Sequence, residues 1–590
     1  MNFFKQIKIE LVHILKHKFI LIVSILFLLI GVAGPILSYA MDKYYENQRD
    51  NYYQEYAVME TSMNGATAVF EVGGASESMD KEEPFYYEIR NYEVDMLMTL
   101  EDLKANGEQK VYEYAEALRL EQLDYFLEES QIITDNLDYR TDLVHKASEL
   151  LNELFVLKSD PEDKDEVIMA VQMITWIEDV EKLTDADEET RKALTEETQE
   201  RFDKINEVIV ANDFAQYINL MISFENEDIE GAKKQIEVQE KAVIENPELE
   251  ESANREILRL EGEIERIEKY RIPAWEYRLE HNIKTTDDAW QNSALNSLES
   301  TVYQIQDTKN SIMTEEEFAQ DEFISSEYES YAEYVESQNK QIQAFEKDLM
   351  ITQNSLQAGK PDMRFVRDGA RSAVNSYLVY SLIVAFLAIL IGGYMIASDF
   401  QAGTIRLLMV RPRTRMKVYS ARYVAGLILG LGVYLGGMIS NIIVNGIILG
   451  FSDYAYPNYT ASGEVGFWGL IIGRILICSV TVIFAYTLAF VFSAVVRNVA
   501  ISIALPCAGV LGGYVLMQML AYSRFAKIMA WTPLVFINLS DFFQRYSGVV
   551  DMMENGVEVN LAYGVVLLLV LSIAMFGFGI WNFMKRDITN

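Results

Sequence analysis

The chain has 590 residues, half of them hydrophobic, and its 88 acidic and 50 basic residues give a formal net charge of −38. The charge is unevenly spread, because residues 42–360 carry a net charge of −47 and the rest of the chain a net charge of +9. So acidic a region excludes nucleic acid as a partner, since the phosphate backbone would repel it. One acidic polar region joined to one basic apolar region is typical of a membrane protein.

The N-terminal residues 1–18 predict an amphipathic helix on the cytoplasmic face of a membrane. One helical face carries apolar residues with lysines beside it, namely Phe3, Phe4, Ile7, Leu11, Ile14 and Leu15. The alternative is a plain extension of the helix that follows. The apolar run 19–41 is longer than the core of a signal peptide and lacks a small-residue cleavage site, so it predicts an uncleaved membrane span.

Five more apolar runs reach the roughly 20 residues that a spanning helix needs; they are 377–397, 424–449, 467–496, 499–520 and 561–583. Six spans place both termini on one side. The short loops and tails of that side carry thirteen basic residues, against six on the other side, so both termini are predicted to be cytoplasmic. Three of the six are Arg364, Arg367 and Arg371, which we expect to face lipid headgroups or acids of the outer domain.

Residues 42–372 predict an acidic, mainly helical extracellular domain. Apolar residues recur at three- and four-residue steps, as in coiled coils, at Phe202–Ile209, Ile257–Ile267 and Ile342–Leu349. Turns are expected at Pro161, Pro247, Pro273 and Pro361, and a hairpin or loop at 61–85. Both ends of the domain are expected to continue as helices into spans one and two. The acidic surface favours solvation over capture of a cationic peptide, because the acids do not cluster.

No catalytic constellation is visible, so the chain is not predicted to be an enzyme. The two cysteines, Cys478 and Cys507, lie in apolar stretches, which leaves no disulfide framework for the outer domain. No Cys/His spacing suits zinc, and a phosphate-binding loop with its Gly-Lys-Ser/Thr ending is absent. We therefore expect no metal and no cofactor in this chain.

The most informative stretch follows span two. It includes Ser398-Asp399-Phe400-Gln401-Ala402-Gly403-Thr404-Ile405-Arg406 and then Arg411-Pro412. Further along stand Val496-Arg497-Asn498, Trp531-Thr532-Pro533 and the tail Phe583-Met584-Lys585-Arg586-Asp587. These motifs, in this six-span order, resemble the membrane subunits of type-2 ABC transporters. The resemblance covers residues 1–41 and 374–590 and leaves out the large outer domain.

The resemblance implies that 373–590 hold spans two to six and that the cytoplasmic loop 398–423 docks on a separate ATPase, which would bind ATP and Mg²⁺. The residues it assigns to this coupling are Asp399, Phe400, Gly403, Thr404, Ile405, Arg406 and Arg411. Asp399 suits the positive end of a short helix, Gly403 a close backbone approach, and the two arginines acids on the partner. The alternative is that these arginines only satisfy the charge bias of cytoplasmic loops.

Inside the spans, small residues at four-residue spacing predict helix packing within one protomer or between two; they are Gly426, Gly430, Gly432 and Gly436. Asn441 and Asn445 are either interhelical hydrogen-bonding residues or part of a substrate pathway. Arg474 is a costly charge in a span. It is expected to reach outward to water, to pair with Glu464, or to line the pathway.

These observations predict the permease subunit of an ATP-driven ABC exporter in a bacterial plasma membrane, paired as a homo- or heterodimer. Its substrate would be a peptide, a toxin or a lipid-like amphiphile. The alternative is an ABC-linked sensor or mechanical transmitter, which moves its outer domain without transport. A third class, an anchored scaffold or receptor, has no need for the basic loop after span two.

Overall fold

The computed structural model describes residues 3–63, 83–135, 137–175, 177, 180–246, 250–366, 369–404, 415–523, 525–544 and 546–585. Within these residues the fold is all-α, as predicted, with one short antiparallel pair of strands, β1 (Asn458–Thr460) and β2 (Gly463–Val465). The internal contacts divide the chain into two compact units. Unit 1 comprises Met1–Glu55 with Ser293–Asn590, and unit 2 comprises Tyr56–Asn292.

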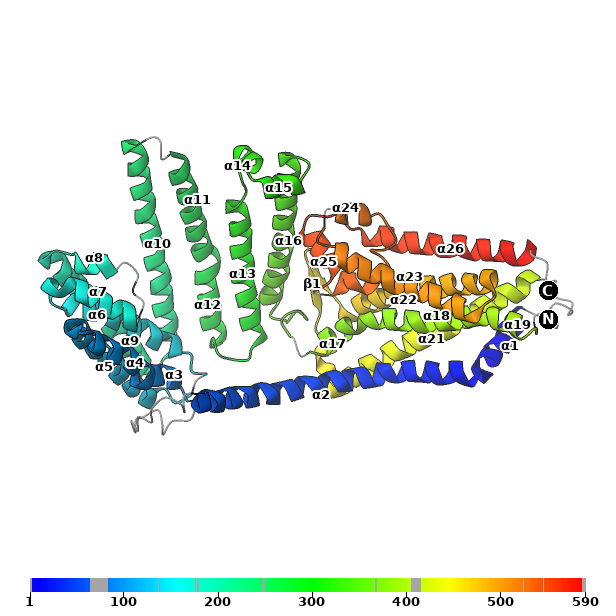
Figure 1. The fold of residues 1–590 in the computed structure, drawn as a ribbon, viewed down its shortest axis with the longest axis horizontal. Helices are drawn as coiled ribbons and strands as arrows, with labels where there is room; N and C mark the ends of the chain where they lie inside the picture. Colours follow the sequence, from blue (N-terminus) through cyan, green and yellow to red (C-terminus); the bar gives the residue numbers. More distant parts are fainter. Residues whose placement is uncertain are drawn as a thin grey trace. The chain divides into compact units, whose positions relative to one another are not determined.

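Six helical segments of unit 1 are long and apolar enough to cross a membrane, so the chain is a multi-pass membrane protein. They are Lys18–Met41, Ala370–Gln401, Arg415–Leu449, Phe467–Val496, Val499–Leu520 and Leu561–Lys585. They lie side by side in Figure 1, with both chain ends at one end of the bundle. We call that end the terminal side and the other the opposite side. All six predicted spans are confirmed, and the second and third are longer than predicted.

The spans are formed by α2 (Lys18–Met63), α17 (Ala370–Ser376) with η7 (Tyr377–Val379), α18 (Tyr380–Met395) and α19 (Ala397–Gln401), then α21 (Arg415–Leu449), α22 (Phe467–Val496), α23 (Val499–Leu520) and α26 (Leu561–Lys585). Short elements occupy the opposite-side loops, namely η8 (Phe451–Ala455), α24 (Ala526–Met529), η9 (Leu539–Phe543) and α25 (Gly548–Glu554).

The N-terminal helix is an element of its own. It is α1 (Phe3–Lys16), and the helix stops at His17 before α2 begins. Figure 1 shows the two at an angle. A plain extension of span one is therefore wrong. The buried positions of α1 are Gln6, Glu10 and Ile14, whereas Phe4 and Ile9 are exposed, so part of the face packed on the bundle is polar.

We call the segment between spans one and two, residues 42–369, the outer segment, and its two ends differ. At its start, α2 continues as one helix from Lys18 to Met63, as expected. At its end, the expectation of a helix running into span two is wrong. Helix α16 (Tyr331–Ala358) ends at Gly359, whose φ of +63° is the left-handed conformation that closes a helix. Residues 360–366 are not helical, and α17 begins only at Ala370.

The last helices of the outer segment belong to unit 1 with the spans. They are α13 (Trp290–Asn310), α14 (Glu315–Gln320), α15 (Glu322–Glu327) and α16. Helix α16 is linked to the opposite-side loops by charge, because Lys340 pairs with Glu558 at 3.3 Å and Glu333 pairs with Lys527. Just beyond its end, the backbone N–H of Tyr459 donates to Asp362 at 2.7 Å. The outer segment is thus shared between the two units.

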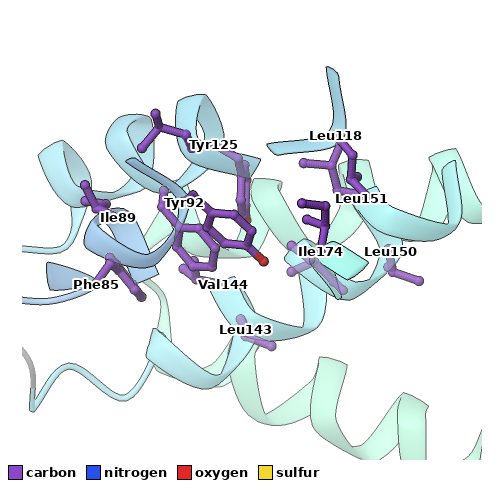
Figure 2. Packing of buried hydrophobic residues seen from close by; sticks show 14 of the residues in the cluster. Phe85, Ile89, Tyr92, Leu118, Tyr125, Leu143, Val144, Leu150, Leu151 and Ile174 are labelled. Atoms are coloured by element: carbon purple, nitrogen blue, oxygen red, sulfur yellow. The ribbon is translucent and has the colours of Figure 1, made fainter. Parts of the chain in front are cut away.

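Unit 2 is a helical domain with its own hydrophobic core. Its elements are α3 (Tyr86–Arg90), η3 (Asn91–Asp95), α4 (Met96–Asn106), α5 (Gln109–Ile132), α6 (Thr141–Lys158), η4 (Pro161–Asp163), α7 (Lys164–Ile174), α8 (Val180–Thr184), α9 (Glu188–Ala211), α10 (Phe214–Glu245), α11 (Glu250–Arg266), η6 (Ile267–Arg271) and α12 (Ile272–His281). Figure 2 shows Tyr92, Tyr125 and Val144 facing one another in this core. The core explains how a domain without disulfides holds together.

The predicted apolar seams mark buried faces in part. Ile205 and Ile209 are buried in the core of unit 2, and Leu260 and Ile267 are buried on the helix that packs against α10. The turn predicted at Pro273 is wrong. The helix passes from α11 through the wider turn η6 into α12, and a wider turn accommodates a proline that lacks a backbone N–H.

Of the other three predicted turns, two are confirmed and one lies outside the described residues. Pro161 opens the single turn η4, and Pro361 lies between α16 and α17, as expected. Pro247 and most of the predicted hairpin 61–85 lie outside the described residues.

Span one is held to spans two and three by close backbone contacts. The hydroxyls of Tyr377 and Tyr380 donate to the carbonyl oxygens of Ile30 and Phe27 at 2.7 and 2.5 Å. Beside them, a Cβ placed on Gly31 would lie 2.7 Å from the Cα of Gly437. Since that neighbour is backbone, it cannot move aside as a side chain can.

We predict that Gly31→Ala lowers the free energy of unfolding by about 1–3 kcal/mol through overpacking. The matched control is Gly473→Ala in α22, where a Cβ would meet nothing within 4 Å in the part of the chain that the structure describes, so that the helix propensity of alanine acts alone. Thermal unfolding of the two purified variants in detergent is the measurement. Equal stability of the two would show that spans one and three do not meet at Gly31.

Candidate functional site

A buried cluster of charges lies on the terminal side of the bundle. Arg422 of α21 is only 4% exposed. Its guanidinium pairs with Asp399 of α19, lies 3.4 Å from the carboxylate of Glu10 on α1, and donates to the carbonyl oxygen of Met395 at 3.1 Å. Three segments far apart in the sequence therefore share one cation.

The residues after span two form a turn beside this cluster. The hydroxyl of Thr404 donates to the carboxylate of Asp399 at 2.8 Å, so Asp399 bridges the turn and Arg422. The ring of Phe400 lies 4.4 Å from the guanidinium carbon of Arg497, at the turn between α22 and α23. Such contacts are attractive because the face of the ring is negative.

The structure adds to the predicted roles of two of these residues. Asp399 lies in the first turn of the five-residue α19, near the helix start as expected, and it also pairs with Arg422, so it neutralises a buried charge. Gly403 has a φ of +68°, while a Cβ there would meet nothing within 4 Å among the described residues. It is therefore required by the backbone conformation of the turn.

The structure brings together Asp399, Phe400, Gly403 and Thr404, while Ile405, Arg406 and Arg411 lie outside the described residues. It adds Glu10, Arg422 and Arg497, which were not among the individual residues assigned to coupling from the sequence, although Arg422 lies within the predicted loop 398–423. A signal for Glu10 did exist, since it is the one acidic residue of α1. We call Glu10, Asp399 and Arg422 the charge cluster.

The four glycines predicted to pack span three have unequal surroundings. A Cβ on Gly426 would lie 2.4 Å from the hydroxyl of Tyr486 in α22, and one on Gly436 would lie 3.0 Å from Leu28 of α2. At Gly430 the contact is ordinary, at 3.8 Å, and at Gly432 nothing lies within 4 Å among the described residues. Gly426 and Gly436 thus allow close approach within the chain, and Gly432 does not contribute to it.

Asn441 and Asn445 line a cavity on the opposite side. Its volume is about 390 Å³, and it lies between the middle of α2, helix α17 and the end of α21. The side-chain amide of Asn445 donates to the amide oxygen of Asn441 at 3.0 Å. We call this cavity the amide pocket, after these two floor residues. A third predicted residue, Arg474, does not line it.

One of the alternatives for Arg474 was an ion pair with Glu464. This pair does not form. The guanidinium of Arg474 donates to the side-chain oxygen of Asn375 at 2.5 Å and lies over the ring of Phe543 at 5.1 Å. Glu464 instead pairs with Lys360 at 3.5 Å. The charge in span four therefore has polar and aromatic partners within the bundle.

Arg371 is fully buried, and its predicted surroundings were wrong. Its backbone N–H and its Nε donate to the two carboxylate oxygens of Asp453 at 2.7 and 2.9 Å, and a terminal nitrogen donates to the carbonyl oxygen of Pro361 at 2.9 Å. Asp453 belongs to the short loop between spans three and four, not to the outer domain or the lipid. Arg364 does pair with acids of the outer segment, Asp348 and Asp362, while Arg367 lies outside the described residues.

A buried carboxyl group lies in the loop before the last span. Asp541 is 3% exposed and accepts a hydrogen bond from the amide of Asn538 at 2.5 Å. Burial raises the pKa of Asp541 to about 7, although the hydrogen bonds from Asn538 and Tyr514 act to lower it. The carboxyl group thus changes its charge near neutral pH.

The comparisons with known proteins found similarity to proteins whose function is not described. Residues 345–589 match a family model described as "Protein of unknown function (DUF2705)". The "Uncharacterized protein YhcI" of Bacillus subtilis (strain 168) is 24% identical over 225 residues, which are 37% of this chain and 69% of that protein. No solved structure matches. The matched family region contains Asp399, Arg422 and spans two to six, but neither Glu10 nor span one.

We predict that stability falls as pH rises through the pKa of Asp541. In the unfolded chain an aspartate has a pKa of about 3.9, so between about pH 4 and 7 the folded state holds the extra proton. Because the folded state binds more protons, each pH unit in this window costs at most about 1.4 kcal/mol of stability. Asp541→Asn should remove this dependence when thermal unfolding is compared at pH 5 and pH 8. Asp551→Asn, a partly exposed residue of the same loop, should keep it, and an unchanged slope in Asp541→Asn would contradict the prediction.

Proposed function

We propose that this chain is the permease subunit of an ATP-driven ABC transporter, energised by a separate ATPase subunit. The observation that carries the proposal is that ion pairs attach the turn 398–404 to the helical bundle. This turn carries the residues that resemble the ATPase-docking loop of type-2 permeases, and Asp399 ties it to Arg422 and, through that arginine, to Glu10.

The charge cluster would transmit a movement of this loop to the helices of the bundle. Removing one partner of a buried ion pair costs about 3–5 kcal/mol, because the remaining charge is left buried alone. A displacement of the turn at Asp399 therefore carries α1 and the first turns of α21 with it. Helix α1, the end of span two at α19 and the start of span three at α21 would then move together when an ATPase pair closes on ATP.

Orientation and assembly follow from the same proposal. The terminal side would be cytoplasmic, where the ATPase and its ATP and Mg²⁺ are found, and the opposite side would face outward, in agreement with the thirteen-to-six bias in basic residues. The most apolar parts of spans one and six are only 22% and 17% buried within this chain. These faces leave area for lipid and for a second permease copy.

The second candidate function is a sensor or mechanical transmitter in which nothing is carried across. The ion pairs that link α16 to the opposite-side loops favour it, because motion of the bundle would reach the outer segment through them. Exposed pairs of this kind are each worth about 0–1 kcal/mol. They are weaker than the buried cluster, so we place transport first.

We predict that the purified chain hydrolyses no ATP and that it co-purifies with a separate ABC ATPase when the two are expressed together. Arg406→Glu combined with Arg411→Glu should abolish co-purification or uncouple hydrolysis from transport, since charge reversal turns attraction across an interface into repulsion. The measurements are size-exclusion elution of the complex and ATPase activity in reconstituted vesicles.

Lys340→Glu combined with Lys527→Glu is the matched control. It makes the same change in charge on the opposite side, where both lysines are paired with acids, and should leave assembly intact. ATP hydrolysis by the chain alone, or normal assembly and coupling after reversal of the two arginines, would refute the proposal.

The orientation has its own test. In a background carrying Cys478→Ala and Cys507→Ala, we predict that Glu200→Cys reacts with a membrane-impermeant thiol reagent in intact cells and that Met409→Cys reacts only after the cells are lysed. Glu200 is an exposed residue of α9. Equal labelling in intact cells, or the reverse order, would overturn the assignment of cytoplasmic termini.

A further inference from the structure

The amide pocket has an unusual floor. Asn441 is fully buried on α21 and its amide oxygen accepts from Asn445. Its amide nitrogen, however, has no hydrogen-bond partner among the residues that the structure describes. A buried donor left without an acceptor costs about 1–3 kcal/mol, and hydrocarbon surroundings supply none. The floor therefore has a donor to offer to a bound group.

The walls of the pocket are partly polar. Hydroxyl groups come from α2 and α17, at Ser38 and Ser376, while Pro35 and Leu449 supply apolar surface. The one charged residue that lines the described pocket is Lys43, which is exposed near the end of span one. A purely apolar occupant would leave the floor donor unsatisfied, and an occupant with a positive charge would be repelled by Lys43.

Outside the pocket, the flanking helices present apolar surface. Three exposed residues are Ile36 and Leu37 of α2 and Ile447 of α21. Each is adjacent in the sequence to a residue that lines the pocket. In a membrane span such residues lie against acyl chains. A ligand whose polar group enters the pocket can thus keep an apolar tail on the outside of the bundle.

We propose that the amide pocket binds an anionic phosphate group, and that its source is the headgroup of a phospholipid in the leaflet of the opposite side. A phosphate diester supplies acceptor oxygens for the amide of Asn441 and a negative charge for Lys43. The volume of about 390 Å³ lies within the range of ligand pockets and suits a headgroup better than a whole lipid. The binding site goes beyond the proposed function, because it exists whether or not the lipid is transported.

The test uses the full chain, purified in detergent and stripped of lipid, without an ATPase. Fluorescent phosphatidylglycerol is titrated as the anionic probe and fluorescent phosphatidylcholine as the zwitterionic one. We expect saturable binding of phosphatidylglycerol that weakens about ten- to a hundredfold in Asn441→Leu, the range for loss of a hydrogen bond to a charged group. Asn441→Asp should bind the anionic probe more weakly still, since it places a like charge beneath the phosphate.

Two further variants keep the result interpretable. Ser440→Ala changes a polar residue next to the pocket floor, on the same helix but outside the lining, and should bind as the unmodified chain does. Lys43→Gln changes an exposed position and should weaken binding of phosphatidylglycerol several-fold. It therefore tests the site even if a substitution of Asn441 fails to fold.

Competition identifies the source of the phosphate. If millimolar inorganic phosphate or glycerol 3-phosphate displaces the lipid probe, the pocket takes its phosphate from water; if only phospholipid displaces it, the source is the membrane. Both results support the phosphate chemistry. The proposal is overturned if no saturable binding occurs, or if Asn441→Leu and Lys43→Gln both bind the anionic probe as tightly as the unmodified chain. Since no ATPase is present, neither result depends on the transporter assignment.

Discussion

A buried arginine lies at each end of the helical bundle, and the surrounding chain is arranged to neutralise it. Taking a cation out of water is costly unless it finds a carboxylate and further hydrogen bonds inside the protein. On the opposite side Arg371 gathers Asp453 and the carbonyl oxygen of Pro361. On the terminal side Arg422 gathers Asp399 and Glu10. The positions of α1, of the turn after span two and of the segment after α16 all follow from these two requirements.

The spans could be predicted from the sequence because hydrocarbon imposes a simple length and composition on a helix that crosses it. The bounds of spans four and five were also predicted, but the start of span two could not be. The second helical segment begins at Ala370 and includes Arg371, a charge that hydropathy alone places outside. Its neutralising partner is 82 positions away, and no local pattern announces such a pair. The same holds for Pro273, where the wider turn η6 lets the helix continue through a residue that usually ends one.

In the candidate site too, residues that are close in the sequence could be predicted, whereas those brought together by tertiary contacts could not. Asp399, Phe400, Gly403 and Thr404 were identified through a motif, because they are close in sequence. Glu10 joined them only through tertiary contact, and the amide pocket required three helices to meet. Asn441 and Asn445 could be recognised from the sequence as a pair on one helical face, since residues four apart are neighbours. That the pair forms the floor of a cavity depends on α2 and α17.

The contacts that hold span one also set an order of events during synthesis. The hydroxyl of Tyr377 meets the carbonyl of Ile30 across 347 positions of chain. At about 5–20 residues per second, a ribosome needs roughly 20–70 s to make that stretch. Span one therefore enters the membrane long before its partners exist, with the backbone of Gly31 facing lipid. During this interval the bilayer, a chaperone or a second nascent chain must cover that face, and the bundle closes only when the whole outer segment has been translated.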